Sequence, residues 1–217
     1  MRTYKIHLIR HGWTEANQKG FYIGTTDLPL PIESILELGD LTQRALYPDA
    51  EWVFSSPLTR AVQTAEIIYP DSDIVEVENL SEICFGEYEG KSIADAKTDK
   101  LFSRFVAGDV DVTPKGAENP KDFILRCINA ITTIVNLMMT SKVHTAAVIT
   151  HMSVVGQILS NLALPKAMPY EWNPPPGFGY TIVADPVIYL REPVFEILEP
   201  LPNPYKSRDD YLPEFYE

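Results

Sequence analysis

Cysteine is scarce in this chain, with only Cys84 and Cys127 among 217 residues. The two thiols lie far apart in the sequence and have neither the spacing of a zinc site nor the density of a disulfide framework. The sequence therefore excludes a disulfide-rich secreted scaffold. We expect both cysteines to be reduced thiols, as in a cytoplasmic protein.

Basic residues and long apolar runs are also few. Lysine and arginine number 18 against 30 acidic residues, for a net charge of −12. This balance disfavours binding to nucleic acid or to an anionic membrane, since both require a cationic surface. We found no signal peptide and no run approaching the roughly 18 apolar residues of a membrane span. The sequence predicts a soluble cytoplasmic protein, in which local cations would hold any anionic substrate.

What the chain does have is an alternation of short apolar runs and longer segments with helical periodicity. This pattern predicts a single α/β domain over residues 1–200, with a mostly parallel central sheet and helices on both faces. An acidic, proline-containing arm is expected over residues 201–217. The predicted strands are 6–9, 52–54, 74–77, 146–149, 180–183 and 194–198. The predicted helices are 32–46, 57–68, 93–105, 120–138 and 153–162.

Two predicted helices have recognisable starts. Ser56 precedes Pro57, and Asn119 precedes Pro120. Serine and asparagine are favoured helix caps, and proline is favoured at the first helical position. We therefore expect Ser56 and Asn119 to cap the helices that follow them.

Reactive side chains follow three of the predicted strands. Arg10 and His11 end the first strand, Arg60 lies one turn into the helix after the second, and His151 follows the strand 146–149. A glycine-containing loop adds Glu82. The carboxyl ends of parallel strands meet at one sheet edge, which is where ligands bind in open α/β sheets. Convergence of these five residues favours an anion-binding, reactive site.

Each of these residues also has a structural interpretation when taken alone. A single histidine is more often a hydrogen-bonded structural residue than a nucleophile. A single arginine usually makes a surface salt bridge that contributes little to stability. Glu82 has Glu87 and Glu89 as neighbours, and all three could be solvated. Four aromatic residues also allow two interpretations, since they could line a leaving-group pocket or pack in the core. They are Phe21, Trp172, Phe178 and Tyr180.

Three stretches resemble motifs of the histidine phosphatase superfamily, the cofactor-dependent phosphoglycerate mutase-like enzymes. Residues 8–17 read LIRHGWTEAN, residues 55–66 read SSPLTRAVQTAE and residues 80–90 read LSEICFGEYEG. They occur in the family's order. The chain departs from the family pattern at Ala117, where glycine is commoner, and at Met152, where glycine usually follows the second histidine. Ile23 precedes Gly24, where threonine or cysteine is frequent.

The resemblance implies a role for each matched residue. His11 would be the nucleophile that forms a phosphohistidine, kept neutral by the fields of Arg10 and Arg60. Glu82 would protonate the leaving alcohol and then activate water, and His151 would stabilise the transition state. Substrate contacts are implied for seven residues: Arg10, Asn17, Gly24, Arg60, Glu82, His151 and Met152. The arginines supply the charge that a metal supplies elsewhere, so we expect no metal and no cofactor.

Within the family, the sequence favours an acid-type phosphatase acting on a small phosphomonoester. Residues 85–90 resemble the phosphatase branch, and no paired arginines of a mutase occur between Gly90 and Glu118. Two alternatives stay open. One is a cofactor-dependent phosphoglycerate mutase, and the other is a non-catalytic binding or regulatory member with a site altered by Met152 or by the tail. A homodimer is also left open.

Overall fold

The computed structural model describes residues 3–44 and 46–202, which form a seven-stranded sheet of order β3-β2-β4-β1-β6-β7-β5. The strands are β1 (Tyr4–Arg10), β2 (Trp52–Ser55), β3 (Ile74–Glu76), β4 (Thr145–Thr150), β5 (Ala163–Leu164), β6 (Gly179–Ala184) and β7 (Phe195–Leu201). Of these described strands only β6 runs opposite to β1, since β7 is antiparallel to β6 and β5 is parallel to β7. The predicted mostly parallel α/β fold is confirmed.

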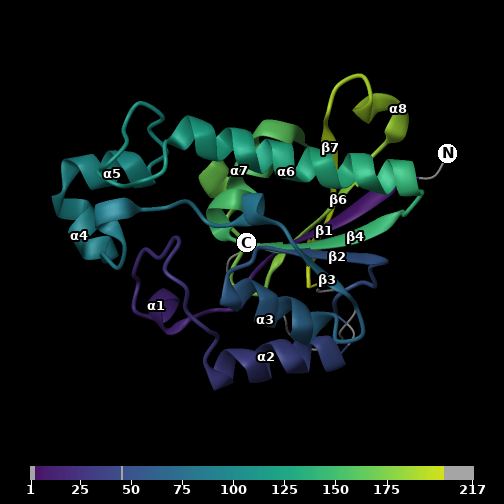
Figure 1. Ribbon diagram of the computed structural model, residues 1–217, viewed down its shortest axis with the longest axis horizontal. Helices are drawn as coiled ribbons and strands as arrows, with labels where there is room; N and C mark the ends of the chain where they lie inside the picture. The colour runs from purple at the N-terminus through teal and green to yellow at the C-terminus, as the bar shows by residue number, and fades with distance from the viewer. Residues whose placement is uncertain (1–2, 45, 203–217) are drawn as a thin grey trace.

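Helices cover both faces of this sheet, as Figure 1 shows. The helices are α1 (Glu15–Gln18), α2 (Ile32–Gln43), α3 (Thr59–Ile68), α4 (Ile93–Thr98), α5 (Lys100–Val106), α6 (Pro120–Ser141), α7 (Met152–Leu162) and α8 (Pro186–Tyr189). Helices α6 and α7 lie on one face and α2 and α3 on the other. The periodic apolar stripes of these helices are buried against the apolar strands, which gives two cores separated by the sheet.

Helix α6 is the long core helix on the face of the sheet that it shares with α7. Asn119 caps it as predicted, since its side chain accepts a hydrogen bond from the Lys121 N–H at 2.9 Å. It has 22 residues, and an 18-residue segment of it has a mean hydropathy of 1.5, so it is the one helix among the described residues long and apolar enough to cross a membrane. It is not a continuous apolar run, because Arg126, Asn129 and Asn136 interrupt it. Its buried stripe, which includes Phe123 and Met138, packs in the core, which accounts for the apolar composition on that side.

Two helix predictions need correction. Helix α3 begins at Thr59 rather than at Pro57, and the Asp27 carboxylate accepts bonds from both the Thr59 N–H and its hydroxyl, at 2.8 and 2.6 Å. The distant Asp27 thus replaces Ser56 as the cap. The helix predicted over 93–105 is two helices, because Asp99 leaves the helical conformation and caps α5 through Leu101 and Phe102.

The C-terminal part of the chain completes the sheet. The predicted strands in this region form the antiparallel pair β6 and β7, and the two-residue strand β5, which was not predicted, lies at the edge. Strand β7 continues to Leu201, which is fully buried. Residues 203–217, most of the expected acidic arm, lie outside the described residues.

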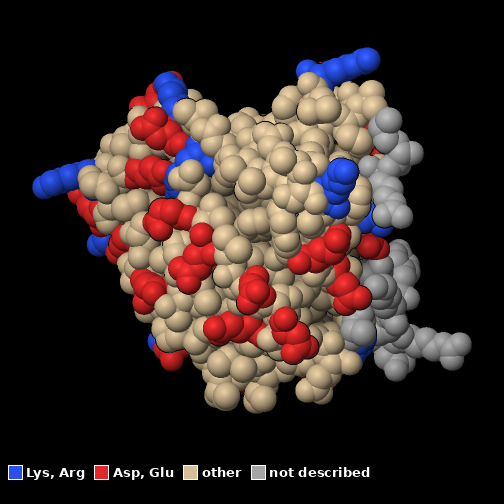
Figure 2. Space-filling model, turned by 45° about the vertical axis from the view of Figure 1, so that its right-hand side comes forward, with Lys and Arg blue, Asp and Glu red and all other residues tan. Residues whose placement is uncertain are grey.

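Charge on the surface follows the acidic composition. Figure 2 shows acidic side chains spread across one face of the molecule, with basic side chains standing apart from one another. That distribution agrees with the net charge of −12. A phosphate ester would therefore have to be attracted by cations inside a pocket rather than by the surface as a whole.

Candidate active site

The pairing of β1 with β4 brings two of the predicted residues together. Arg10 lies opposite Thr150 in this parallel pair, and the His11 N–H bonds to the Thr150 carbonyl at 2.9 Å. His11 and His151, each one residue beyond its strand, consequently have ring centroids 5.0 Å apart. The strand register therefore assembles the two histidines at the carboxyl edge of the sheet.

His11 is buried and held in one tautomer. Its Nδ1 lies 2.6 Å from the Gly12 carbonyl oxygen, which can only accept, so the proton belongs on Nδ1. The lone pair of Nε2 then accepts a bond from the Nε–H of Arg60 at 3.3 Å. Burial, followed by the charges of Arg60 and Arg10, lowers the pKa of His11 well below its ordinary value. The sequence pointed to the arginine fields, whereas burial contributes more.

Arg60 projects from the first turn of α3 and is only 2% exposed. Its Nη1 donates to the Thr26 carbonyl at 3.0 Å and its Nη2 to the Gly24 carbonyl at 2.8 Å. Together with the bond to His11, these contacts use three of the five N–H groups of a guanidinium. The remaining two are the donors that Arg60 has for an anion.

Arg10 lines the same cavity as His11. Its Nη1 donates to the Pro174 carbonyl at 2.9 Å, and its buried Nε has no hydrogen-bond partner. Burial lowers the pKa of Arg10 to about 10, while Glu82 opposes that shift. Arg10 is therefore charged near neutral pH and carries an unsatisfied N–H, which an anionic ligand would satisfy.

His151 is fully buried behind His11, and its Nε2 lies 2.8 Å from the hydroxyl of Ser56. Its Nδ1 is buried without a hydrogen-bond partner. Burial, then the charge of Arg60, lowers the pKa of His151 well below its ordinary value. Ser56 thus orients a histidine instead of capping a helix, a role that the sequence did not indicate.

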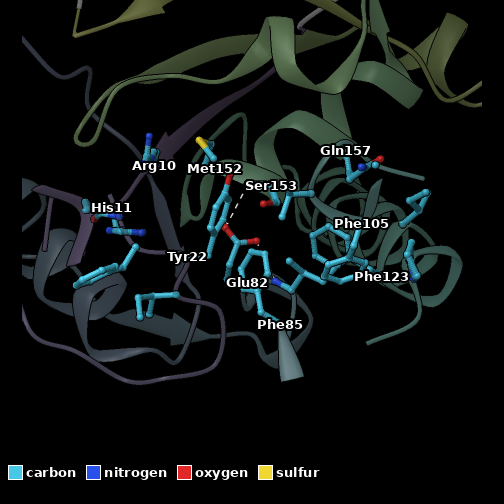
Figure 3. A pocket seen from close by; sticks show the side chains of 18 of the residues that line it. Arg10, His11, Tyr22, Glu82, Phe85, Phe105, Phe123, Met152, Ser153 and Gln157 are labelled. Carbon is cyan, nitrogen blue, oxygen red and sulfur yellow. Dashed lines mark hydrogen bonds between the residues drawn. The ribbon is translucent and has the colours of Figure 1, made fainter. Parts of the chain in front are cut away.

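Glu82 is only 6% exposed and lies in the loop that follows the short 3₁₀ helix Glu78–Leu80. Its carboxylate accepts bonds from the Ile83 N–H at 2.9 Å and from the Ser153 N–H at 3.3 Å. Burial raises the pKa of Glu82, and these two bonds and Arg60 only partly offset the effect. The solvated interpretation of Glu82 is therefore excluded. Figure 3 shows Glu82 between the side of the pocket that holds Arg10 and His11 and the side that holds Phe105 and Phe123.

The other predicted binding residues differ in their positions. Asn17 lines the cavity, and its amide oxygen accepts from the Thr14 N–H, leaving its amide NH₂ as the donor. Met152 also lines the cavity and has no positive φ, so the backbone there does not require glycine. Gly24 is absent from the described cavity lining. Its N–H is bonded to Glu89 and its carbonyl to Arg60.

Glu89 and Arg126 support the site, although the sequence indicated no role for either. The Glu89 carboxylate accepts from the N–H groups of Gly24, Thr25 and Phe85 and from the Thr26 hydroxyl, at 2.8–3.2 Å. It thereby fixes the loop whose carbonyls hold Arg60.

Arg126 of α6 pairs with Glu118, with Nε and Oε1 2.6 Å apart, and donates to the Ser81 and Glu82 carbonyls at 2.7 and 3.1 Å. It therefore fixes the backbone that carries Glu82. Glu89 lies within the third motif and Glu118 lies at the Gly-Ala-Glu departure, so motif position was the only signal available for this support.

Replacing Glu89 with glutamine is expected to lower kcat/KM for a phosphomonoester by about tenfold or more. An amide offers one oxygen where the carboxylate offers two, and its NH₂ would face backbone donors, so the loop and Arg60 would lose their positions. Glu87→Gln is the matched control, because the one bond that Glu87 accepts, from the Lys115 N–H, can be kept by an amide oxygen. Equal rates for the two variants would refute the role of Glu89.

The cavity has a volume of about 160 Å³ and extends away from the reactive groups. Arg10, His11 and Glu82 are in its lining, whereas Arg60 and His151 are buried and are not among the lining residues. Of the aromatic residues considered from the sequence, Phe21 lines the cavity, and Trp172 and Tyr180 pack edge to face with centroids 5.6 Å apart. In the part of the chain that the structure describes, no cluster of three or more His, Cys, Asp or Glu side chains is arranged to hold a metal ion.

Comparison with known proteins agrees with this geometry. The sequence matches the histidine phosphatase superfamily (branch 1) over residues 6–178. It is 35% identical over 89 residues to a putative phosphoserine phosphatase of Hydrogenobacter thermophilus, covering 40% of this chain and 44% of that protein. It is 27% identical over 165 residues to a probable phosphoglycerate mutase of Proteus mirabilis, covering 74% and 76%. The matched region spans less than half the length of the first curated relatives.

Solved structures share the fold. A putative α-ribazole-5′-phosphate phosphatase of Escherichia coli superposes with a TM-score of 0.75 at 21% identity, covering 91% of this chain and 95% of that one. A phosphoglycerate mutase of Bacillus anthracis gives a TM-score of 0.75 at 16% identity, covering 94% and 95%. At these identities the likeness establishes the fold alone. The match over residues 6–178 establishes the family, and this chain belongs to branch 1 of the histidine phosphatase superfamily.

Proposed function

We propose that this protein hydrolyses phosphomonoesters through a phosphohistidine formed at Nε2 of His11. The observation that carries the proposal is the state of His11, which is neutral, protonated on Nδ1 and has the Nε2 lone pair beside Arg60. A neutral imidazole is the form able to attack phosphorus. Buried Glu82, in the same cavity lining, is an acid of raised pKa suited to protonating a leaving group.

The proposed reaction has two steps. In the first, the Nε–H of Arg60 turns from Nε2 of His11 to a phosphoryl oxygen and frees the lone pair of Nε2. Nε2 then attacks phosphorus, the ester P–O bond breaks, and the leaving oxygen takes the proton of Glu82. Arg60 and Arg10 hold the non-bridging oxygens, His151 contributes to the same charge stabilisation, and the Gly12 carbonyl keeps the Nδ1 proton. In the second, the Glu82 carboxylate takes a proton from water as the water attacks phosphorus, and the electrons of the P–N bond return to His11.

Phosphatase activity is favoured over mutase activity by the charges of the pocket. Arg10 is the one lysine or arginine in the described lining of the cavity, whereas a bisphosphate needs cations for its second anionic end. The mutase names among the relatives keep that reaction as the second candidate. A non-catalytic role is disfavoured because the five expected groups are intact and Met152 lies in the cavity lining without altering the backbone. The substrate we propose is a small phosphorylated metabolite of the cytoplasm, hydrolysed without a cofactor.

The test is release of inorganic phosphate from p-nitrophenyl phosphate and from a panel of phosphorylated metabolites between pH 5 and 8, with and without EDTA. We expect turnover that EDTA leaves unchanged, because two arginines supply the required charge. Interconversion of phosphoglycerates without release of phosphate would instead establish the mutase. Failure to turn over any ester would leave only the binding role.

A further inference from the structure

The cavity beyond the reactive groups has an apolar wall. Phe85, Phe105 and Phe123 are among its lining residues, and Phe85 and Phe105 meet edge to face with centroids 6.0 Å apart. Ile83 and Met152 add aliphatic surface. In Figure 3, Phe105 and Phe123 lie on the side of Glu82 away from His11. The part of the substrate next to the ester oxygen would therefore meet mainly hydrocarbon.

A larger cavity of about 640 Å³ lies beside this one. Val106, Gly108, Met152, Ser153 and Gln157 are among the residues that line both. The outer cavity is bounded by α7 and by the short 3₁₀ helix Pro169–Trp172. Its polar groups are neutral hydroxyls and amides, supplied by Ser160, Asn161, Tyr170 and Asn173.

The charged side chains in the two described linings all lie in the inner cavity, at the end that holds His11. Arg10, His11 and Glu82 are the ionisable groups of the inner cavity apart from the Tyr22 phenol, and the described outer lining contains no Asp, Glu, Lys, Arg or His side chain. Two nearby basic side chains have other partners: Arg104 Nη2 lies 2.7 Å from the Asp109 carboxylate, and Lys166 donates to the Asn161 carbonyl. A second anionic group on the substrate would therefore meet no counter-charge in these two linings.

From this arrangement we propose that the substrate is the monophosphate ester of an elongated, uncharged alcohol. An apolar or aromatic group would lie next to the ester oxygen, against Phe105 and Phe123, and a neutral hydrogen-bonding group would reach Gln157 and the outer cavity. The inference rests on the proposed function and narrows it. It excludes phosphoserine, phosphoglycerates and sugar bisphosphates as good substrates, because each carries a further charge.

The experiment compares 4-carbamoylbenzyl phosphate with 4-carboxybenzyl phosphate. The two esters have the same size and the same leaving CH₂–O group and differ in the charge at the far end. For the wild-type protein we expect kcat/KM to be at least about tenfold higher for the carbamoyl compound, since the cavity lining beyond Arg10 offers a carboxylate no counter-charge. Gln157→Arg should reduce that ratio by supplying a cation. Asn136→Arg is the control. Asn136 is exposed near the C-terminal end of α6, away from the cavity, so this variant adds the same charge outside the site and should leave the ratio unchanged.

Equal or faster hydrolysis of the carboxylate by the wild-type protein would overturn the substrate class while leaving the phosphatase reaction intact. A ratio that Gln157→Arg does not change, in a variant whose thermal unfolding matches the wild type, would also contradict it. If the wild type releases phosphate from neither ester nor from p-nitrophenyl phosphate, the proposed function itself fails. The wild-type comparison decides the question even if the Gln157 variant does not fold.

Discussion

Replacing His11 with alanine is expected to lower kcat for every phosphomonoester by a factor of about 1,000 or more, because no P–N bond can then form. The variant should also lose the covalent intermediate. That intermediate is measured by mixing wild-type protein with a ³²P-labelled ester, quenching without acid, and showing that the protein-bound label is stable in base and lost in acid. Peptide mapping should place the label on His11.

The matched variant for this experiment is His151→Ala, which should slow turnover and still form the adduct. Each protein is first compared by circular dichroism and thermal unfolding, since both histidines are buried. Label found on Ser56 or on His151 of the wild-type protein would contradict the mechanism. So would unchanged turnover by His11→Ala.

Replacing Glu82 with glutamine is expected to have the second large effect, and its size should depend on the leaving group. For benzyl phosphate, kcat should fall by a factor of about 100 to 10,000, because the amide cannot protonate the departing alkoxide. For p-nitrophenyl phosphate the leaving group needs no proton, so the first step should persist while water attack slows. Rapid mixing should then show a burst of about one p-nitrophenol per protein followed by a slow phase. The absence of a burst, with both esters slowed equally, would argue against Glu82 as the acid.

The pH dependence of the wild-type protein tests the same carboxyl group. Burial raises the pKa of Glu82 above its ordinary value, so the acid form persists to higher pH and is lost as the pH rises through that pKa. The ratio of kcat/KM for benzyl phosphate to that for p-nitrophenyl phosphate should therefore be highest at acidic pH and fall with rising pH. The pKa of His11 is lowered well below its ordinary value, so protonation of His11 should not reduce activity at mildly acidic pH. The second ionisations of the two phosphates differ and also affect this ratio, but they are the same for both proteins, so the comparison with Glu82→Gln isolates the contribution of Glu82. In that variant the part of the pH dependence due to Glu82 should be lost.

The hydrogen bonds that hold the site residues in place could not be predicted from the sequence, because they join residues far apart in the chain. Ser56 has the sequence signature of a helix cap, yet the β2–β4 register places its hydroxyl beside His151. Asp27 takes over the cap of α3. Local propensity describes a few neighbouring residues and cannot detect a competing partner supplied by the fold. For the same reason the hydrogen bonds of Glu89 and Arg126 could not be predicted, because their partners lie in other loops.

By itself the sequence determined the alternation of strands and helices, because hydrophobic periodicity records which face of each element is buried. It also predicted that His11 and His151 meet, since parallel strands bring their carboxyl ends to one edge. Only the tertiary structure decided the tautomer of His11, through the Gly12 carbonyl, and the dominance of burial over the arginine fields in its pKa. It alone decided that Phe105 of α5 and Phe123 of α6 form one apolar wall beside Glu82. Periodicity shows that a side chain is buried, but the packing of helices determines what it is buried against.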